Sequence, residues 1–252
     1  MSRAPLAIDL FCGLGGWTEG LLAEGWDVIG FDIERHTYGE HRYPAQLVIQ
    51  DVLTLHGSQF RDADLIVASP PCQAYSYRAM PWSRAKALPP PDNTLFEACF
   101  RIQREACEAA GRHIPLVVEN VRGAQRWVGQ ARWRYGSFYL WGDIPALMPI
   151  AVNAVKAPGM NWSDQTKRGQ DFTRLAGRHA MDGIKQAGLT GERANGKGSH
   201  RFQDGAARHG SKSNARKAAS AMIAKIPLPL SRHVAQVFKN APLELGNSGI
   251  GC

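Results

Sequence analysis

The first 150 residues alternate between short apolar runs and segments with a helical pattern, and this alternation constrains the fold more than any other feature. Strands that alternate with helices form a largely parallel sheet with helices on both faces. The apolar runs predict strands at residues 6–11, 26–32, 46–50, 64–69, 114–119 and 135–141. A helix is expected up to Ala23 and another at Thr94–Ala110, with Asn93 as its cap and Gly111 at its end. The sequence therefore predicts an α/β fold with a mixed sheet of about seven strands.

The pattern changes after Pro149. Residues 159–210 contain ten glycines, and residues 156–217 contain 13 Lys and Arg against 5 Asp and Glu, an excess equal to the net charge of the whole chain, +8. A basic excess in one segment indicates contact with a polyanion, most simply nucleic acid, although a merely solvated loop region is the alternative. We expect an α/β domain at 1–150, a short basic segment for recognition of the polyanion at 151–217, a helical region at 218–240 and a tail at 241–252.

Membrane insertion, disulfides and metal binding are not predicted. No apolar run approaches the roughly 20 residues of a membrane span, and the N-terminus lacks a signal-peptide pattern. The five cysteines are scattered and contain no Cys-x-x-Cys pair, so neither a disulfide framework nor a zinc site is indicated. Cys99 and Cys107 are expected to pack in the core. A cytoplasmic monomer without a metal is the expectation.

A glycine-rich turn follows the first predicted strand, in the run Asp9-Leu-Phe-Cys-Gly-Leu-Gly-Gly16. Such a turn between a strand and a helix lets the backbone approach a ligand closely. Asp32 ends the second strand, where a carboxylate meets ribose hydroxyls in nucleotide-binding folds. The glycine spacing is not that of the dinucleotide fingerprint. An acid at Asp9 suits a cationic or amino-bearing ligand better than a pyrophosphate.

A second constellation, Ser69-Pro-Pro-Cys72-Gln, follows the fourth predicted strand at its carboxyl end, where open α/β sheets place their sites. Two prolines fix the backbone just before the thiol, which suits a nucleophile. The loop 73–93 is long for a compact domain and is typical of a functional loop. Glu119 ends the neighbouring fifth strand, and a buried carboxyl is costly unless it is paired or functional. We expect it beside Cys72.

These motifs, with Glu119-Asn120-Val121, resemble the cytosine-C5 DNA methyltransferases in order and residue type over about the first 150 residues. The resemblance implies a Rossmann-like class I methyltransferase fold and double-stranded DNA as partner. It also implies that Cys72 adds to C6 of a flipped-out cytosine while Glu119 donates a proton to N3. The C5 carbon then accepts a methyl group from S-adenosylmethionine. Asn120 would orient the base and the thiol loop.

The resemblance also assigns a donor pocket. Phe11 and the glycine turn would hold the amino-acid and sugar portions, and Asp32 the ribose. Ile33 would pack on the adenine, and Asp51 would accept from its amino group. The full set of expected donor-binding residues is Asp9, Phe11, Gly13, Leu14, Gly15, Gly16, Asp32, Ile33, Asp51, Val52, Pro70, Leu95 and Lys225.

Two segments depart from the family pattern. Arg132 and Arg134 match a Gln-x-Arg-x-Arg motif that positions the flipped cytosine, but the following strand ends later, at Gly142, than the family spacing requires. Lys225 stands where the family has an asparagine close to the donor. It either points to solvent or contacts a carboxylate of carboxy-S-adenosylmethionine, in which case a carboxymethyl group would be transferred.

Two other functions use similar sequences. Methylation of cytosine in structured RNA uses the same motifs, but the Cys-Phe-Thr tripeptide typical of that branch is absent. An inactive DNA-binding subunit is the second alternative, and the intact Cys72 and Glu119 argue against it. The short chain and compact recognition segment fit a phage or mobile-element enzyme.

Overall fold

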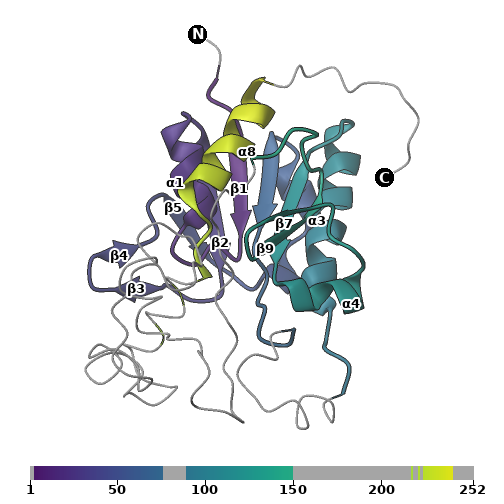
Figure 1. The fold of residues 1–252 in the computed structure, drawn as a ribbon. Helices are drawn as coiled ribbons and strands as arrows, with labels where there is room; N and C mark the ends of the chain where they lie inside the picture. The colour runs from purple at the N-terminus through teal and green to yellow at the C-terminus, as the bar shows by residue number, and fades with distance from the viewer. Residues whose placement is uncertain (1–2, 76–88, 150–216, 218–220, 222–223, 241–252) are drawn as a thin grey trace.

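The computed structural model describes residues 3–75, 89–149, 217, 221 and 224–240 (Figure 1). Apart from Lys217, the predicted recognition segment lies outside these residues, and so does the tail. The predicted division of the chain into four parts therefore stays a prediction.

A seven-stranded mixed sheet forms the centre of the fold, as predicted. Its order is β5-β2-β1-β6-β7-β9-β8, and β9 alone runs against the others. The bounds are β1 Leu6–Leu10, β2 Asp27–Asp32, β5 Gln46–Ile49, β6 Leu65–Ala68, β7 Leu116–Asn120, β8 Trp133–Tyr135 and β9 Phe138–Gly142. A separate small hairpin, β3 Thr37–Tyr38 and β4 His41–Arg42, was not predicted.

Helices cover both faces of the sheet (Figure 1). The α-helices are α1 Gly16–Ala23, α3 Thr94–Ala110, α4 Gln125–Val128 and α8 Leu228–Asn240, and the short 3-10 turns are η1 Val52–Thr54, η2 Gly57–Phe60 and η4 Arg122–Ala124. The core alternates along each strand. On β6, Leu65 and Val67 pack in the cluster of α1 and α8, whereas Ile66 and Ala68 pack in the cluster of α3. Burial on both faces explains why the central strands read as continuous apolar runs.

The strand order places the site. The chain runs outward from β1 through β2 to β5, then returns to β6 on the other side of β1. This is the order of a doubly wound sheet, and ligands bind such sheets outside the carboxyl ends of the strands where the order reverses. The carboxyl ends of β1 and β6 are therefore the expected binding edge. Asp9 lies on β1, and the Cys72 segment follows β6.

The prediction of one strand at 135–141 was wrong. Residues 133–142 form the hairpin of β8 and β9 instead, with Gly136 and Ser137 between the two strands. Gly136 has a φ of 60°, a left-handed conformation that glycine adopts at no steric cost and that two-residue hairpin turns require. The Gly136-Ser137 pair is the sequence feature that indicates this turn.

Asn93 stands at the N-cap position of α3, as predicted, but its side chain does not cap the helix. The Asn93 side chain makes no capping hydrogen bond, whereas Asp92 Oδ1 accepts from the Thr94 backbone N–H at 2.8 Å. The Asn93 side chain instead forms hydrogen bonds with the Tyr75 hydroxyl and the Trp127 carbonyl. Gly111 does end α3 in a left-handed conformation, as predicted, and Cys99 and Cys107 are buried in the core as expected.

Candidate active site

The glycine-rich turn is built by backbone geometry and by Asp32. Phe11 leaves β1 with a φ of 56°, rare for a residue with a side chain, and Gly13 follows with a φ of 51°. The Gly13 N–H donates to Asp32 Oδ2 at 2.9 Å, and the Cys12 N–H donates to the Phe31 carbonyl at 3.1 Å. These two hydrogen bonds join the segment after β1 to the carboxyl end of β2, at the expected binding edge.

The glycines of the turn serve different purposes. A Cβ at Gly15 would lie 2.5 Å from Pro44 Cδ, and a Cβ at Gly16 would lie 2.4 Å from the Ile226 backbone nitrogen. A Cβ at Gly13 would meet nothing within 4 Å. Gly15 and Gly16 are therefore required by packing within the protein. At Gly13 only the backbone conformation favours glycine, and the space beside it is open.

Asp9 lies under this turn, with 1% of its surface exposed. Its Oδ2 accepts from the Thr18 hydroxyl at 2.6 Å, and the same hydroxyl lies 2.7 Å from the Tyr43 hydroxyl. Asp9 Oδ1 has no hydrogen-bond partner among the described residues. Burial, and to a lesser degree the charge of Asp32, raises the pKa of Asp9 to about 7. A cationic group near this carboxyl would favour its ionised form.

Asp32 is held as a carboxylate. Burial by itself would raise its pKa, but hydrogen bonds from His36 and from the Gly13 N–H outweigh burial and lower the pKa of Asp32. His36 Nε2 lies 3.5 Å from Asp32 Oδ1. An ionised acceptor at the end of β2 suits the pair of hydroxyls on a ribose.

The residues predicted to surround an adenine differ in how exposed they are and in what they contact. Ile33 is 69% exposed at the end of β2, so it offers an apolar surface to a ring. Asp51 Oδ1 accepts from the Leu53 N–H at 2.9 Å and caps η1. Leu95 is half-buried near the start of α3. Val52 is only 2% exposed and packs in the α3 core, so the structure gives its side chain a packing role.

The Cys72 segment and the end of β7 are joined by a hydrogen bond. Asn120 Nδ2 donates to the Pro70 carbonyl at 3.0 Å, and Asn120 Oδ1 accepts from the Val121 N–H at 2.8 Å. Asn120 and Glu119 are buried, whereas Cys72 is half-buried. Since β6 and β7 are neighbours in the sheet, the thiol segment and the Glu119 carboxyl emerge from adjacent strands, as predicted.

Arg132 and Arg134 lie farther away along the sheet. Both are exposed, and Arg134 belongs to β8, which β9 separates from β7. In register, Arg134 pairs with Tyr139, which pairs in turn with Asn120. Arg134 on β8 therefore lies level with Asn120 on β7, and Tyr139 on β9 lies between them.

Lys225 does not point to solvent. Its ammonium donates to Glu19 Oε1 at 2.5 Å, and the lysine side chain is only 14% exposed. Its Cγ would lie 3.0 Å from a Cβ at Gly16. The lysine therefore packs on the glycine turn, and its charge is balanced from α1. Leu14, the remaining predicted turn residue, is 5% exposed and packs with Tyr38 and Ala221.

Several contributing residues were missed from the sequence. Thr18, Tyr43 and His36 complete the surroundings of the two aspartates, and Tyr75 and Asn93 support the Cys72 segment. Only His36 had a local signal, its position four residues after Asp32. The others are brought in by tertiary contacts.

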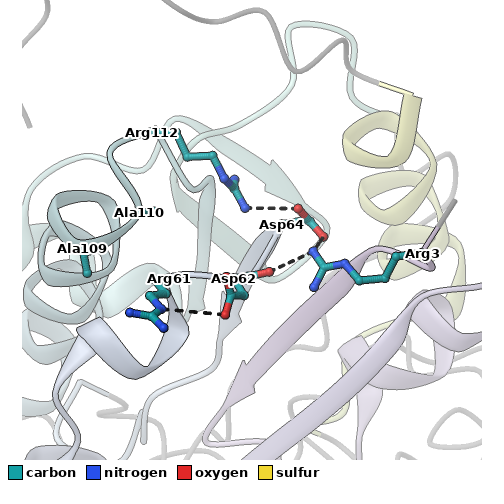
Figure 2. A pocket seen from close by; sticks show the side chains of 7 residues that line it. All are labelled: Arg3, Arg61, Asp62, Asp64, Ala109, Ala110 and Arg112. Atoms are coloured by element: carbon teal, nitrogen blue, oxygen red, sulfur yellow. Dashed lines mark hydrogen bonds and ion pairs between the residues drawn. The ribbon is translucent and has the colours of Figure 1, made fainter.

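A pocket at the opposite edge of the sheet is unrelated to these residues. Figure 2 shows its lining of Arg3, Arg61, Asp62, Asp64, Ala109, Ala110 and Arg112. Asp64 accepts from Arg3 at 3.1 Å, from Arg112 at 3.2 Å and from the Leu6 N–H at 2.9 Å. Asp64 directly precedes β6, Leu6 begins β1, and Arg112 precedes β7, so these contacts join the amino ends of three neighbouring strands. The pocket is therefore lined by residues that stabilise the fold.

Within the described ranges, no group of three or more His, Cys, Asp or Glu residues is arranged to hold a metal ion. None of the helices described there combines the length and apolar character needed to span a membrane.

Comparisons with known proteins agree with the site in the first half of the chain. The model of the C-5 cytosine-specific DNA methylase family matches residues 6–126, from β1 into α4. A search of curated proteins finds no match. An E. coli prophage protein named as a DNA modification methyltransferase is similar in structure, with 26% identity and a TM-score of 0.36 over 50% of this chain and 35% of that one.

Two further solved structures are similar. Spodoptera frugiperda DNMT2, in a mutant form, has 19% identity and a TM-score of 0.34 over 50% of this chain and 38% of that one. S. pombe Dnmt2 methyltransferase has 12% identity and a TM-score of 0.46 over 94% of this chain and 99% of that one. The chain thus spans about a third of the length of the first two. The matched segment contains the glycine turn, Asp32, Cys72 and Glu119. Residues 6–126 are therefore similar to the C-5 cytosine-specific DNA methylase family.

Proposed function

We propose that this protein methylates cytosine at C5 in double-stranded DNA, with S-adenosylmethionine as donor. The observation that carries the proposal is the hydrogen bond from Asn120 to the Pro70 carbonyl. It joins the Cys72 segment to β7, the strand that carries Glu119, within the part of the chain that matches the family model. A thiol nucleophile and a proton donor on adjacent strand ends are what attack on a pyrimidine ring requires.

The residues at the carboxyl ends of β1 and β2 fit the proposed donor. An ionised Asp32 suits the ribose hydroxyls, and the exposed Ile33 suits the adenine ring. Asp9 has an oxygen without a partner among the described residues, which suits a positively charged donor. When bound, S-adenosylmethionine would supply an electrophilic methyl group.

The protein's own residues perform the remaining chemistry. C5 of cytosine is a poor nucleophile and must be activated. The Cys72 thiolate adds to C6 while Glu119, in its acid form, donates a proton to N3, which makes C5 electron-rich. After C5 has gained the methyl group, its hydrogen leaves as a proton to solvent, Cys72 leaves as a thiolate, and N3 returns its proton to the Glu119 carboxylate, which restores the aromatic ring. A base that is stacked and paired within a duplex is not accessible to attack at C6, so the cytosine must be flipped out.

Lys225 bears on which group is transferred. A carboxylated donor would need a cation to receive its carboxylate, and Lys225 is the candidate. However, Glu19 already balances its charge at 2.5 Å. The ion pair therefore supports an ordinary methyl donor and gives no support to carboxymethyl transfer.

The first test is the product. After expression in a bacterial host, nucleoside mass spectrometry of host DNA is expected to show 5-methylcytosine, and bisulfite-type sequencing to give the target site. The purified protein should form 5-methylcytosine with S-adenosylmethionine and no carboxymethylcytosine with carboxy-S-adenosylmethionine. Carboxymethylcytosine as the main product would reverse the assignment of the donor.

The second part of the test addresses Cys72. A duplex that contains 5-fluorocytosine at the target site should form a covalent complex with the wild type and donor, and none with Cys72→Ala. Cys107→Ala is the matched control, because Cys107 is a buried core cysteine on α3 and should leave trapping intact. A complex with structured RNA but not with DNA would contradict DNA as the substrate.

A further inference from the structure

The segment that carries Cys72 is fixed on both sides of the thiol. Before it, the Pro70 carbonyl accepts from Asn120. After it, the Tyr75 N–H donates to the Cys72 carbonyl at 3.0 Å and closes a turn. Tyr75 itself is only 3% exposed, so its ring anchors this turn in the core.

The Tyr75 hydroxyl extends this anchor to two helices. It donates to Asn93 Oδ1 at 2.9 Å, and Asn93 Nδ2 donates to the Trp127 carbonyl at 3.3 Å. Asn93 precedes α3, and Trp127 lies in α4. One amide side chain thus connects the thiol turn, the start of α3 and the helix that follows Glu119.

The backbone of the two active-site loops is also in direct contact. A Cβ at Gly123 would lie 2.2 Å from the Tyr75 carbonyl oxygen, a distance that real side chains do not tolerate. Gly123 lies in η4, shortly after Glu119 and Asn120. The position of Tyr75 is therefore coupled to the position of the carboxyl-bearing strand end.

We propose that the Tyr75–Asn93 hydrogen bond is a clasp that holds Cys72 at the attack position relative to Glu119, and that Tyr75 and Asn93 are positioning residues for the reaction. This inference rests on the proposed function. It concerns a hydroxyl and an amide that touch neither the base nor the donor, and that act by fixing the thiol turn. A displacement of about 1 Å at a reacting group is enough to cost on the order of a hundredfold in rate.

The experiment compares Tyr75→Phe, which removes one oxygen, with Tyr135→Phe as a control. Tyr135 is also a buried tyrosine, 7% exposed, and lies in β8. Under single-turnover conditions, Tyr75→Phe is expected to slow covalent complex formation on the fluorocytosine duplex by on the order of tenfold. The donor dissociation constant should stay unchanged. Tyr135→Phe should keep the wild-type rate. A purely structural role would lower the melting temperature of Tyr75→Phe but leave the rate unchanged well below melting, and that result would overturn the clasp.

A double-mutant cycle tests whether Tyr75 acts through Asn93. If the two residues form one clasp, Tyr75→Phe with Asn93→Ala should be no slower than the slower single variant. Slowing that multiplies in the double variant would overturn the proposal.

Alkylation of Cys72 by iodoacetamide, followed by peptide mass spectrometry, provides a readout that does not require methylation. Loss of the clasp should raise the alkylation rate of Cys72 severalfold, on the scale of local opening. If the wild type forms no covalent complex with any nucleic acid, the proposed function fails, and the alkylation rates still decide the clasp. Equal rates in wild type and Tyr75→Phe would refute it.

Discussion

At the scale of the residue, Asp9 shows how the site departs from an ordinary protein interior. A buried carboxyl is costly, and here only one of its oxygens has a partner among the described residues, the Thr18 hydroxyl. That hydroxyl is shared with Tyr43. Incomplete satisfaction of a buried acid is typical of a functional site, because the acid is kept for a ligand.

The raised pKa of Asp9 predicts a dependence of stability on pH. Its pKa is about 7 in the folded protein against an ordinary value of 3.8, so the folded state retains a proton that the unfolded state has lost. The free energy of unfolding therefore falls as the pH rises through this window. Asp9→Asn cannot ionise, and it should stabilise the protein by a few kcal/mol at about pH 8 but little at about pH 4.

Thermal unfolding of wild type and Asp9→Asn across this pH range measures the effect, which amounts to several degrees at the upper end. Asp62→Asn is the control, since Asp62 is 76% exposed on its side chain and should show no comparable trend. A difference in melting temperature that is constant with pH would mean that Asp9 is not buried as a neutral acid.

The sequence was sufficient to locate the main candidate site residues relative to the strands. Asp9 was predicted in the first strand, Asp32 and Glu119 at the ends of two others and Cys72 in the segment after the fourth, and the structure has them in β1, at the ends of β2 and β7, and after β6. The hydrogen-bonding residues around them could not be predicted from the sequence, because the tertiary fold is what brings Tyr43 to Thr18 and Asn93 to Tyr75. A hydrogen bond between segments distant in sequence leaves no periodic signal.

At the scale of the element, the glycine turn combines two separable requirements. Gly13 and Gly15 both have positive φ, 51° and 77°. Only Gly15 also faces a neighbour, Pro44. The sequence located the turn correctly from its glycines, but it gave no means to tell the two positions apart.

Alanine at each position should resolve the two requirements. Gly13→Ala should cost about 1–2 kcal/mol of unfolding free energy for the left-handed backbone alone. Gly15→Ala should cost about 1–3 kcal/mol more, because its Cβ meets Pro44. Urea unfolding measures both. Adding Pro44→Ala should recover much of the extra cost in Gly15→Ala and none in Gly13→Ala. Equal losses at the two positions would show that the contact with Pro44 is unimportant.

At the scale of the whole molecule, α8 closes the fold from far along the sequence. It packs against α1, where a Cβ at Gly20 would lie 2.2 Å from Ser231 Oγ. The Trp26 indole N–H donates to the Ala235 carbonyl at 3.2 Å. The residues just before α8, Lys225 and Ile226, reach the glycine turn. A helical region was expected at 218–240, and within it α8 begins at Leu228, directly after Pro227, and continues to Asn240.

These contacts predict that α8 unfolds together with the sheet and that it stabilises the glycine turn. Leu230 is fully buried, whereas Leu228 on the same helix is 43% exposed. Leu230→Ala should lower the free energy of unfolding by about 2–5 kcal/mol, and Leu228→Ala by no more than about 0.5 kcal/mol. Urea unfolding followed by tryptophan fluorescence and by far-ultraviolet circular dichroism should give one coincident transition for each variant, because Trp26 and the sheet unfold together with α8. If Leu230→Ala were as stable as Leu228→Ala, or if the two probes separated, α8 would be an independent appendage, and its contacts with the glycine turn would not stabilise the site.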